Sequence, residues 1–213
     1  MEAREEILGR VRAALRTARL PARPASLPPI PSSLEAAPPE TWRARFVAEL
    51  RALEVAVHEE ATPEAVRARV RTLVAGRRVR SWASAALPYD LGATLAEASA
   101  SLLDGAAERG ALAAAEVGVT GVDAAIAETG SLALIAAPDR PRTASLLPPK
   151  HVAVVRRADL VPNLRSALAR LRSAIPAASA LHLVTGPSRS ADIELQLTLG
   201  VHGPGELVVV LGP

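Results

Sequence analysis

The sequence predicts an α/β protein whose largely parallel central sheet has helices on its faces, with a helical arm at the N-terminus. Apolar runs typical of strands alternate with helical patterns along most of the 213 residues, and such alternation is typical of parallel sheets. Apolar residues make up 49% of the chain, and most of them are Ala, Leu and Val. The chain can therefore form one domain with a closely packed aliphatic core plus an appendage.

The appendage is an amphipathic helix in residues 1–19, joined to the domain by a linker in residues 20–40. Its apolar residues recur at helical spacing and are Ile7, Leu8, Val11 and Leu15. The linker is dense in proline and serine, which favours an extended tether. We expect an α/β domain in residues 41–213, and an arm that either docks on this domain or serves as a handle for another subunit.

The first half of the domain alternates helices with strands. One helix has clear signals at both ends: Thr62 as N-cap, Pro63 at the first helical position and Gly76 just past the end. A helical pattern precedes this helix from Thr41 onwards. The other expected elements are strands at residues 55–60 and 77–84 and a mainly helical segment at residues 93–107.

The second half begins with a hairpin. Two apolar runs within residues 122–137 are separated by a polar turn in which Gly130 supplies a positive φ. The later elements are a strand at 151–157, a helix at 158–174, a strand at 180–186, a helix starting within 188–192 and a strand at 206–212.

The amino-acid composition and motif spacing exclude several kinds of functional site. The chain has no cysteine, so it has no disulfide, no thiolate nucleophile and no cysteine-ligated cluster of its own. No histidine pair has metal-ligand spacing, and neither a P-loop nor a GxGxxG fingerprint is present, so no metal is predicted. The sequence pI of about 10.4 accompanies a net charge of only +3; the basic residues are scattered arginines, which does not favour nucleic-acid binding.

The N-terminal residues are charged and lack the continuous apolar region of a signal peptide. Nor does any stretch approach the roughly 20 apolar residues of a membrane span. We therefore expect a cytoplasmic protein with no membrane span.

The first candidate site is the turn "TGPSRS" after the strand at 180–186. A helix starting here would direct unpaired backbone N–H groups towards an anion. Gly186, Ser188, Arg189 and Ser190 would then bind a small anionic ligand. The alternative is that a serine merely caps the helix.

The second candidate is "GVTGVDAAIAETGSL", at residues 118–132. Here Glu128 is a candidate nucleophile, acid or base on a hairpin tip, or an ordinary solvated turn residue. The ligand-binding candidates in this stretch are Gly118, Thr120, Gly121, Thr129, Gly130 and Ser131.

The third candidate is the polar loop after the hairpin. It carries Arg140, Arg142, Lys150 and His151, and it could close over an anionic substrate or form a solvated rim. His202, between glycines near the C-terminus, could stack on or protonate a ligand. The other two histidines, in strand-like runs, are expected to be structural.

Three motifs follow one another in the second half of the chain: "GVTGVDAAIAETGSLAL", "RTASLLPPKHVAVVR" and "TGPSRSADIELQLTLGVHGPGELVVVLG". In this order they resemble the lactate-utilisation protein C family, the LUD domain group. The resemblance runs from about Glu116 to the carboxyl end, and the "ILGRVRAAL" arm is similar too.

This resemblance implies a fold like that of the NagB, ribose-5-phosphate isomerase and CoA-transferase superfamily. It also implies a role in oxidising L-lactate to pyruvate with an iron–sulfur subunit and a cysteine-rich subunit as partners. The clusters are expected on a partner, with no cofactor bound by this chain. The family supplies no established catalytic residues, so the role of Glu128 rests on analogy of fold.

Two other hypotheses remain open. The chain could be a stand-alone enzyme acting on a phosphorylated or CoA-linked metabolite, with Glu128 or Asp123 as the acid/base group. It could also be a nucleic-acid or regulatory binder if its arginines gather on one face.

Overall fold

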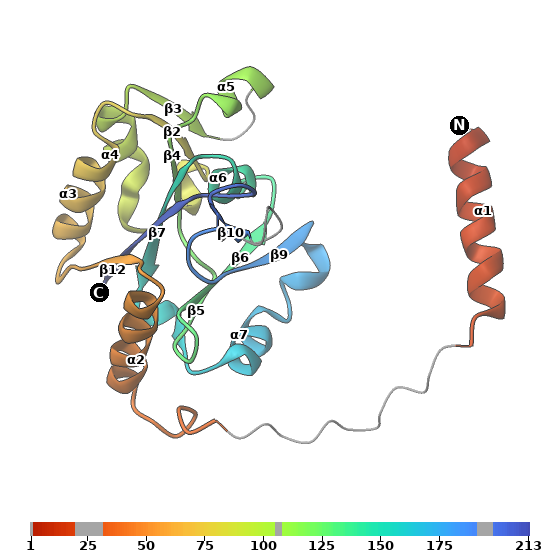
Figure 1. The fold of residues 1–213 in the computed structure, drawn as a ribbon, viewed down its shortest axis with the longest axis horizontal. Coiled ribbons are helices and arrows are strands. Elements are labelled where there is room, and N and C mark those ends of the chain that lie inside the picture. The colour runs from red at the N-terminus through yellow and green to blue at the C-terminus, as the bar shows by residue number, and fades with distance from the viewer. Residues whose placement is uncertain (1, 20–31, 105–107, 191–197) are drawn as a thin grey trace. The chain divides into compact units, whose positions relative to one another are not determined.

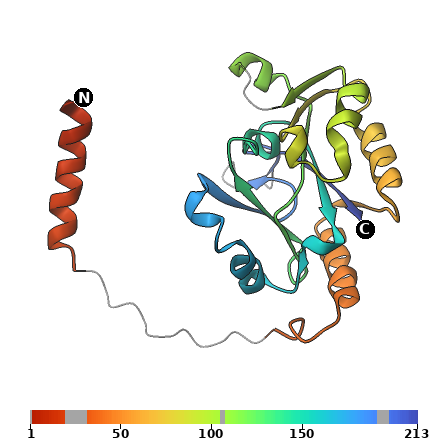
Figure 2. The same ribbon diagram turned by 180° about the vertical axis from the view of Figure 1, so that it is seen from behind.

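A computed structural model describes residues 2–19, 32–104, 108–190 and 198–213 (Figures 1 and 2). The chain divides into two compact units, Met1–Pro31 and Ser32–Pro213. Within the first unit, α1 (Glu2–Thr17) is the predicted amphipathic helix.

The second unit is built on a six-stranded sheet in which every neighbouring pair is parallel. The strand order is β1-β12-β7-β4-β2-β3. The strands are β1 (Ala56–Glu59), β2 (Arg78–Ser81), β3 (Ser101–Asp104), β4 (Val117–Thr120), β7 (Lys150–Arg156) and β12 (Glu206–Gly212). The predicted parallel sheet is thus confirmed, and its two longest strands read as near-continuous apolar runs because both of their faces are covered.

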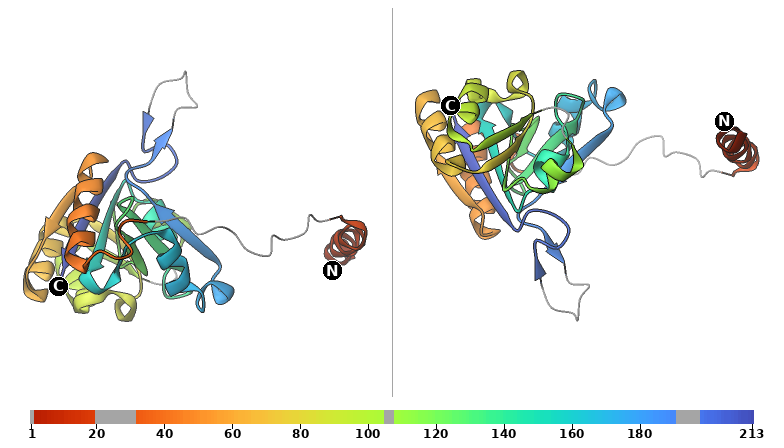
Figure 3. Two further views of the ribbon diagram at one scale, coloured as in Figure 1. Left: turned by 90° about the horizontal axis from the view of Figure 1, so that it is seen from below. Right: turned by 90° about the horizontal axis from the view of Figure 1, so that it is seen from above.

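Helices cover one face of this sheet. Figure 3 shows α2 (Pro39–Ala52) and α3 (Pro63–Val74) on the side opposite the second sheet, and α4 (Leu91–Ala98) packs against α3. The predicted end signals of α3 are confirmed: the Thr62 side chain accepts a hydrogen bond from the Ala65 N–H at 3.2 Å, and Gly76 follows the helix with φ of 66°. Valines on the inner face of α3 are fully buried in the core.

A second, four-stranded sheet packs on the other side of the main sheet. Its order is β8-β5-β6-β9, formed by β5 (Ala124–Ile126), β6 (Ser131–Ala136), β8 (Leu160–Val161) and β9 (Ala180–Val184). The β5–β6 hairpin is the one predicted from the sequence, with φ of 66° at Gly130. Of two further short helices, α7 (Leu164–Leu171) packs on β5 and β8 of this sheet, and α6 (Thr143–Leu146) packs on β4 of the main sheet.

Three predicted helices differ from the structure. The segment at 93–107 is helical only to Ala98, and β3 follows because it pairs with β2. The segment at 158–174 contains β8 before α7. Pro162, between them, lacks the N–H that a helix interior requires, and Asn163 caps α7 by accepting a hydrogen bond from the Ser166 N–H at 2.9 Å. The remaining described helices are α5 (Arg109–Ala113) and the short turns Ser84–Ala86, Pro88–Asp90, Arg157–Asp159 and Ile175–Ala177.

The third difference concerns the expected last helix. Instead of starting a helix, β10 (Arg189–Ser190) pairs antiparallel with β11 (Thr198–Leu199) and extends away from the two sheets (Figure 3). The Ser188 N–H donates to the Pro204 carbonyl at 2.8 Å, and the Gly200 N–H donates to the Ser188 carbonyl at 2.9 Å. The prediction is therefore wrong for residues 188–190, because this backbone is already paired; residues 191–197 lie outside the described part.

No helix among the described residues combines the length and apolar character that crossing a membrane requires.

Two glycines with the same φ test the packing of the hairpin turn. A Cβ on Gly130 would lie 3.1 Å from the Glu49 Cβ and from the Leu50 backbone nitrogen, whereas a Cβ on Gly76 would meet nothing within 4 Å. Both Gly→Ala variants carry the backbone cost of a positive φ, about 1 kcal/mol. We expect Gly130→Ala to lower the free energy of unfolding by roughly 1–2 kcal/mol more than Gly76→Ala, measured by urea denaturation; equal losses would contradict the close contact with α2.

Candidate functional site

A pocket of about 390 Å³ lies where the amino ends of β7 and β12 meet the carboxyl end of β9. Its polar lining residues are Ser145, His151, Thr185, Ser188 and His202. Leucines at 146, 183 and 207 supply an apolar wall. The pocket thus combines hydrogen-bonding groups with apolar surface, as small-molecule sites generally do.

His151 is the central polar group of this pocket. Its side chain is only 1% exposed, and its Nε2 lies 2.9 Å from the hydroxyl oxygen of the fully buried Thr120. The buried Nδ1 has no hydrogen-bond partner among the described residues. Because buried polar atoms are normally paired, this nitrogen is available to a ligand.

The protonation state of His151 follows from its surroundings. Burial lowers the pKa of His151 to about 4, so the ring is neutral at pH 7. The neutral ring has two tautomers, and in one of them the Thr120 hydroxyl donates its proton to Nε2. The ring proton of that tautomer lies on Nδ1, which can donate a hydrogen bond to an oxygen in the pocket.

A chain of hydroxyl groups runs to the rim of the pocket. The Thr129 Oγ1 lies 2.7 Å from the Ser131 Oγ, which lies 2.6 Å from the Thr185 Oγ1. Two predicted ligand-binding residues of the hairpin, Thr129 and Ser131, are therefore connected to the pocket through Thr185.

The predicted glycine at 118 has a packing role beside the pocket. A Cβ at Gly118 would lie 1.8 Å from the Ala144 carbonyl oxygen, so only glycine allows β4 to approach α6 this closely. Gly118 is also in register with His151 on the neighbouring strand. This approach places Ser145, whose hydroxyl donates to the Arg142 carbonyl at 3.1 Å, at the wall of the pocket.

The predicted cations are not brought to the pocket. Arg142 is exposed at the start of α6, and Lys150 pairs with Glu206 at 2.8 Å. Arg189 donates to the Leu53 carbonyl at 3.2 Å and lies 3.4 Å from the Glu54 carboxylate. None of these three residues lines the pocket.

Glu128 is exposed at the hairpin tip, away from this pocket. Its backbone N–H donates to the Pro162 carbonyl at 3.1 Å, and its carboxylate accepts from the Ser32 hydroxyl at 3.5 Å. Gly130 packs on α2, and Gly121 lies at the opposite edge of the main sheet beside Trp82.

The structure therefore brings together His151, Gly186, Ser188 and His202, with Thr120 behind the histidine. Ser190 lies in β10. Two polar lining residues were not predicted, although both stand inside the sequence motifs that were: Ser145 precedes Leu146 in the polar loop, and Thr185 immediately precedes Gly186.

The fold and the pocket define a two-sheet α/β protein with a ligand-sized pocket at a buried neutral histidine. Comparison with protein families identifies it further: the model of the LUD domain matches residues 43–211, and the chain belongs to that family.

The chain is similar to three curated bacterial proteins named lactate utilization protein C. The one from Exiguobacterium sp. is 40% identical over 101 residues, which is 46% of this chain and 44% of that protein. The one from Bacillus licheniformis is 40% identical over 94 residues, 42% of this chain and 39% of that protein. The one from Bacillus subtilis is 37% identical over 101 residues, 46% of this chain and 42% of that protein. The matched part thus spans less than half the length of these relatives.

One solved structure has the same fold. It is a DUF162 family protein from Deinococcus radiodurans, with a TM-score of 0.64 and 23% sequence identity over 83% of this chain and 99% of that chain.

The lowered pKa of His151 predicts how stability depends on pH. Between pH 6.5 and about 4 the unfolded state binds a proton at this histidine that the folded state does not bind. The stability contributed at this position is therefore complete above pH 6.5 and falls as the pH decreases towards 4. The full shift corresponds to about 3 kcal/mol.

The measurement is urea denaturation of the wild-type protein and of His151→Phe across this pH range. We expect the wild-type free energy of unfolding to fall more steeply below pH 6.5 than that of the variant. Parallel pH profiles would contradict a buried neutral histidine.

Proposed function

We propose that this chain takes part in lactate utilisation by binding a small carboxylate, lactate or pyruvate, in the pocket at His151. The observation that carries the proposal is His151, which lines the pocket and whose buried Nδ1 has no partner among the described residues. The names of the similar curated proteins support the lactate role.

The chemistry of the pocket fits a short hydroxy or keto acid. The Nδ1–H of His151 would donate to a carboxylate oxygen, and the Ser188 and Thr185 hydroxyls are further hydrogen-bonding groups of the same pocket. The leucine wall would contact the methyl group. Because Thr185 and His202 are exposed at the rim, the bound anion would keep part of its hydration, which reduces the cost of binding it near a neutral ring.

Partners belong to the same proposal. The chain has no cysteine and so cannot ligate an iron–sulfur cluster through thiolates. We propose that it acts in the cytoplasm with an iron–sulfur subunit and a cysteine-rich subunit, and that the electron transfer of lactate oxidation takes place on those partners. Glu128 receives no role, since it does not line the pocket.

Ligand binding is tested with a matched pair of histidine variants. His182 also has a buried ring nitrogen, Nε2, without a partner among the described residues, and burial lowers its pKa too, but it does not line the pocket. We expect L-lactate or pyruvate to raise the melting temperature of the wild-type protein and of His182→Gln. His151→Phe removes a hydrogen bond to a charged group, about 1.5–3 kcal/mol, so affinity should fall at least tenfold.

Thermal shift followed by isothermal titration calorimetry measures both effects, with acetate as a control for a bare carboxylate. Equal lactate affinity in His151→Phe and His182→Gln would place the ligand elsewhere. The absence of any shift in the wild-type protein at saturating lactate and pyruvate would remove the proposal.

A further inference from the structure

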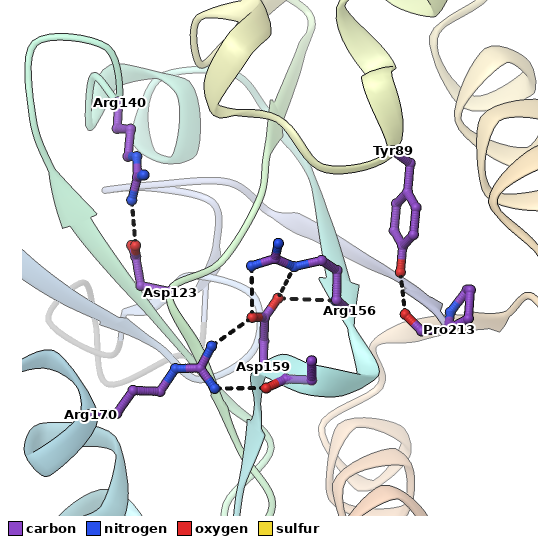
Figure 4. Close-up of polar contacts among 8 residues, drawn as sticks. Tyr89, Asp123, Arg140, Arg156, Asp159, Arg170 and Pro213 are labelled. Carbon is purple, nitrogen blue, oxygen red and sulfur yellow. Dashed lines mark hydrogen bonds and ion pairs between the residues drawn. The ribbon is translucent and has the colours of Figure 1, made fainter.

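A second pocket of about 390 Å³ lies at the carboxyl edge of the main sheet, opposite the pocket at His151. Segments that directly follow β2, β4 and β7 form it, together with the loop after β6 and with α7. Ligands of open α/β sheets habitually bind outside the carboxyl ends of parallel strands. Figure 4 shows the polar side chains that gather there.

Two arginines share one buried carboxylate in this pocket. Asp159, whose side chain is 2% exposed, accepts from Arg156 at 2.9 and 3.0 Å and from Arg170 at 2.9 Å (Figure 4). Arg170 also donates to the Ala158 carbonyl at 2.7 Å. Two guanidinium groups facing one carboxylate leave one positive charge without compensation, and the shared contacts hold both groups in place.

A third arginine is fixed on the other side of the pocket. Arg140 donates to Asp123 at 2.5 Å, and its guanidinium lies 5.4 Å from the centre of the Trp82 ring. The second oxygen of Asp123 accepts from the Ile135 N–H at 2.7 Å. The loop after β6 that carries Arg140 is held in position, because the Ala83 N–H donates a hydrogen bond to the Asp139 carbonyl at 2.8 Å.

Each guanidinium keeps donors for a ligand. The Nη1 of Arg156, the Nε of Arg170 and the Nη2 of Arg140 donate to no acceptor in the part of the chain that the structure describes. The other described residues of the lining are apolar or glycine, apart from the two aspartates already engaged. The pocket lining therefore holds three guanidinium groups against two carboxylates, a net charge of +1. Outside the lining, the exposed Asp139 carboxylate lies 3.8 Å from the Nε of Arg140.

We propose that this pocket binds the phosphate group of a small phosphorylated metabolite. Guanidinium groups pair with phosphate oxygens through paired, charge-assisted hydrogen bonds. A phosphate presents three terminal oxygens and a charge near −2, which suits three arginines on three separate elements better than the two oxygens of a monocarboxylate. The site is separate from the proposed lactate site, because no residue lines both pockets.

Trp82 reports on this site. The chain has two tryptophans, so Trp42→Phe leaves Trp82, in the wall of the pocket, as the only one. We expect inorganic phosphate and glycerol phosphate to change the Trp82 fluorescence saturably. Arg140→Gln and Arg170→Gln in this background should each weaken binding at least tenfold, since each removes a charge-assisted hydrogen bond.

Arg165→Gln is the matched control, because Arg165 lies on α7 like Arg170 but does not line the pocket; it should bind phosphate as the background does. Arg170→Gln removes one of the two arginines paired with a buried carboxylate, so circular dichroism must show that it folds. If it does not, Arg140→Gln decides, because Asp123 keeps its bond from Ile135.

The outcomes separate this site from the lactate site. Phosphate binding that survives in His151→Phe supports the proposal. An unchanged Trp82 signal with phosphate esters, or equal affinity in Arg140→Gln and Arg165→Gln, overturns it. A saturable Trp82 response to lactate or succinate but not to phosphate overturns the phosphate assignment.

Discussion

The parallel pairing of β7 with β12 is the interaction on which the rest of the domain depends. These strands pair from Lys150 with Glu206 to Arg156 with Gly212, and β12 also pairs with β1. The last strand of the chain therefore lies inside the sheet, between elements more than 50 residues apart in the sequence. Because both faces of β7 are covered, five consecutive residues can be buried in its middle while its ends carry polar chemistry.

One strand thereby positions both pockets. His151 lies at the amino end of β7 and Arg156 at its carboxyl end; at about 3.3 Å per residue their Cα atoms lie roughly 16 Å apart. The neighbouring strand β4 also contributes to both pockets. Its last residue, Thr120, forms a hydrogen bond with His151, and Gly121 and the two residues after it line the second pocket. The fixed register of β4 with β7 therefore sets the geometry of two sites on opposite edges.

Local signals predicted the elements that depend on few residues. The caps of α3 and the positive φ of Gly130 could be read from neighbouring residues, and both are confirmed. The pairing of Arg189 with Leu199 could not be predicted in this way, because it joins residues ten positions apart. The local sequence at Arg189 fits the start of a helix equally well. The carboxyl-edge pocket was missed for the same reason: Arg140 and Arg170 come from a loop and a helix, and only the folded chain brings them beside Asp123 and Asp159.

The two pockets differ in the charge of their polar side chains, and this difference determines which anionic ligands each pocket favours. At the amino edge, burial keeps the His151 ring neutral, so the pocket offers hydrogen bonds without a fixed positive charge. A dianion there would lose hydration with no cation to offset the loss. At the carboxyl edge, Arg156 donates hydrogen bonds to the Asp159 carboxylate, and this contact raises the pKa of Arg156. The two aspartates also hold the three guanidinium groups in fixed positions. Preorganised cations favour the ligand with more charge, so a monocarboxylate and a phosphate ester could occupy the same molecule without competing for one site.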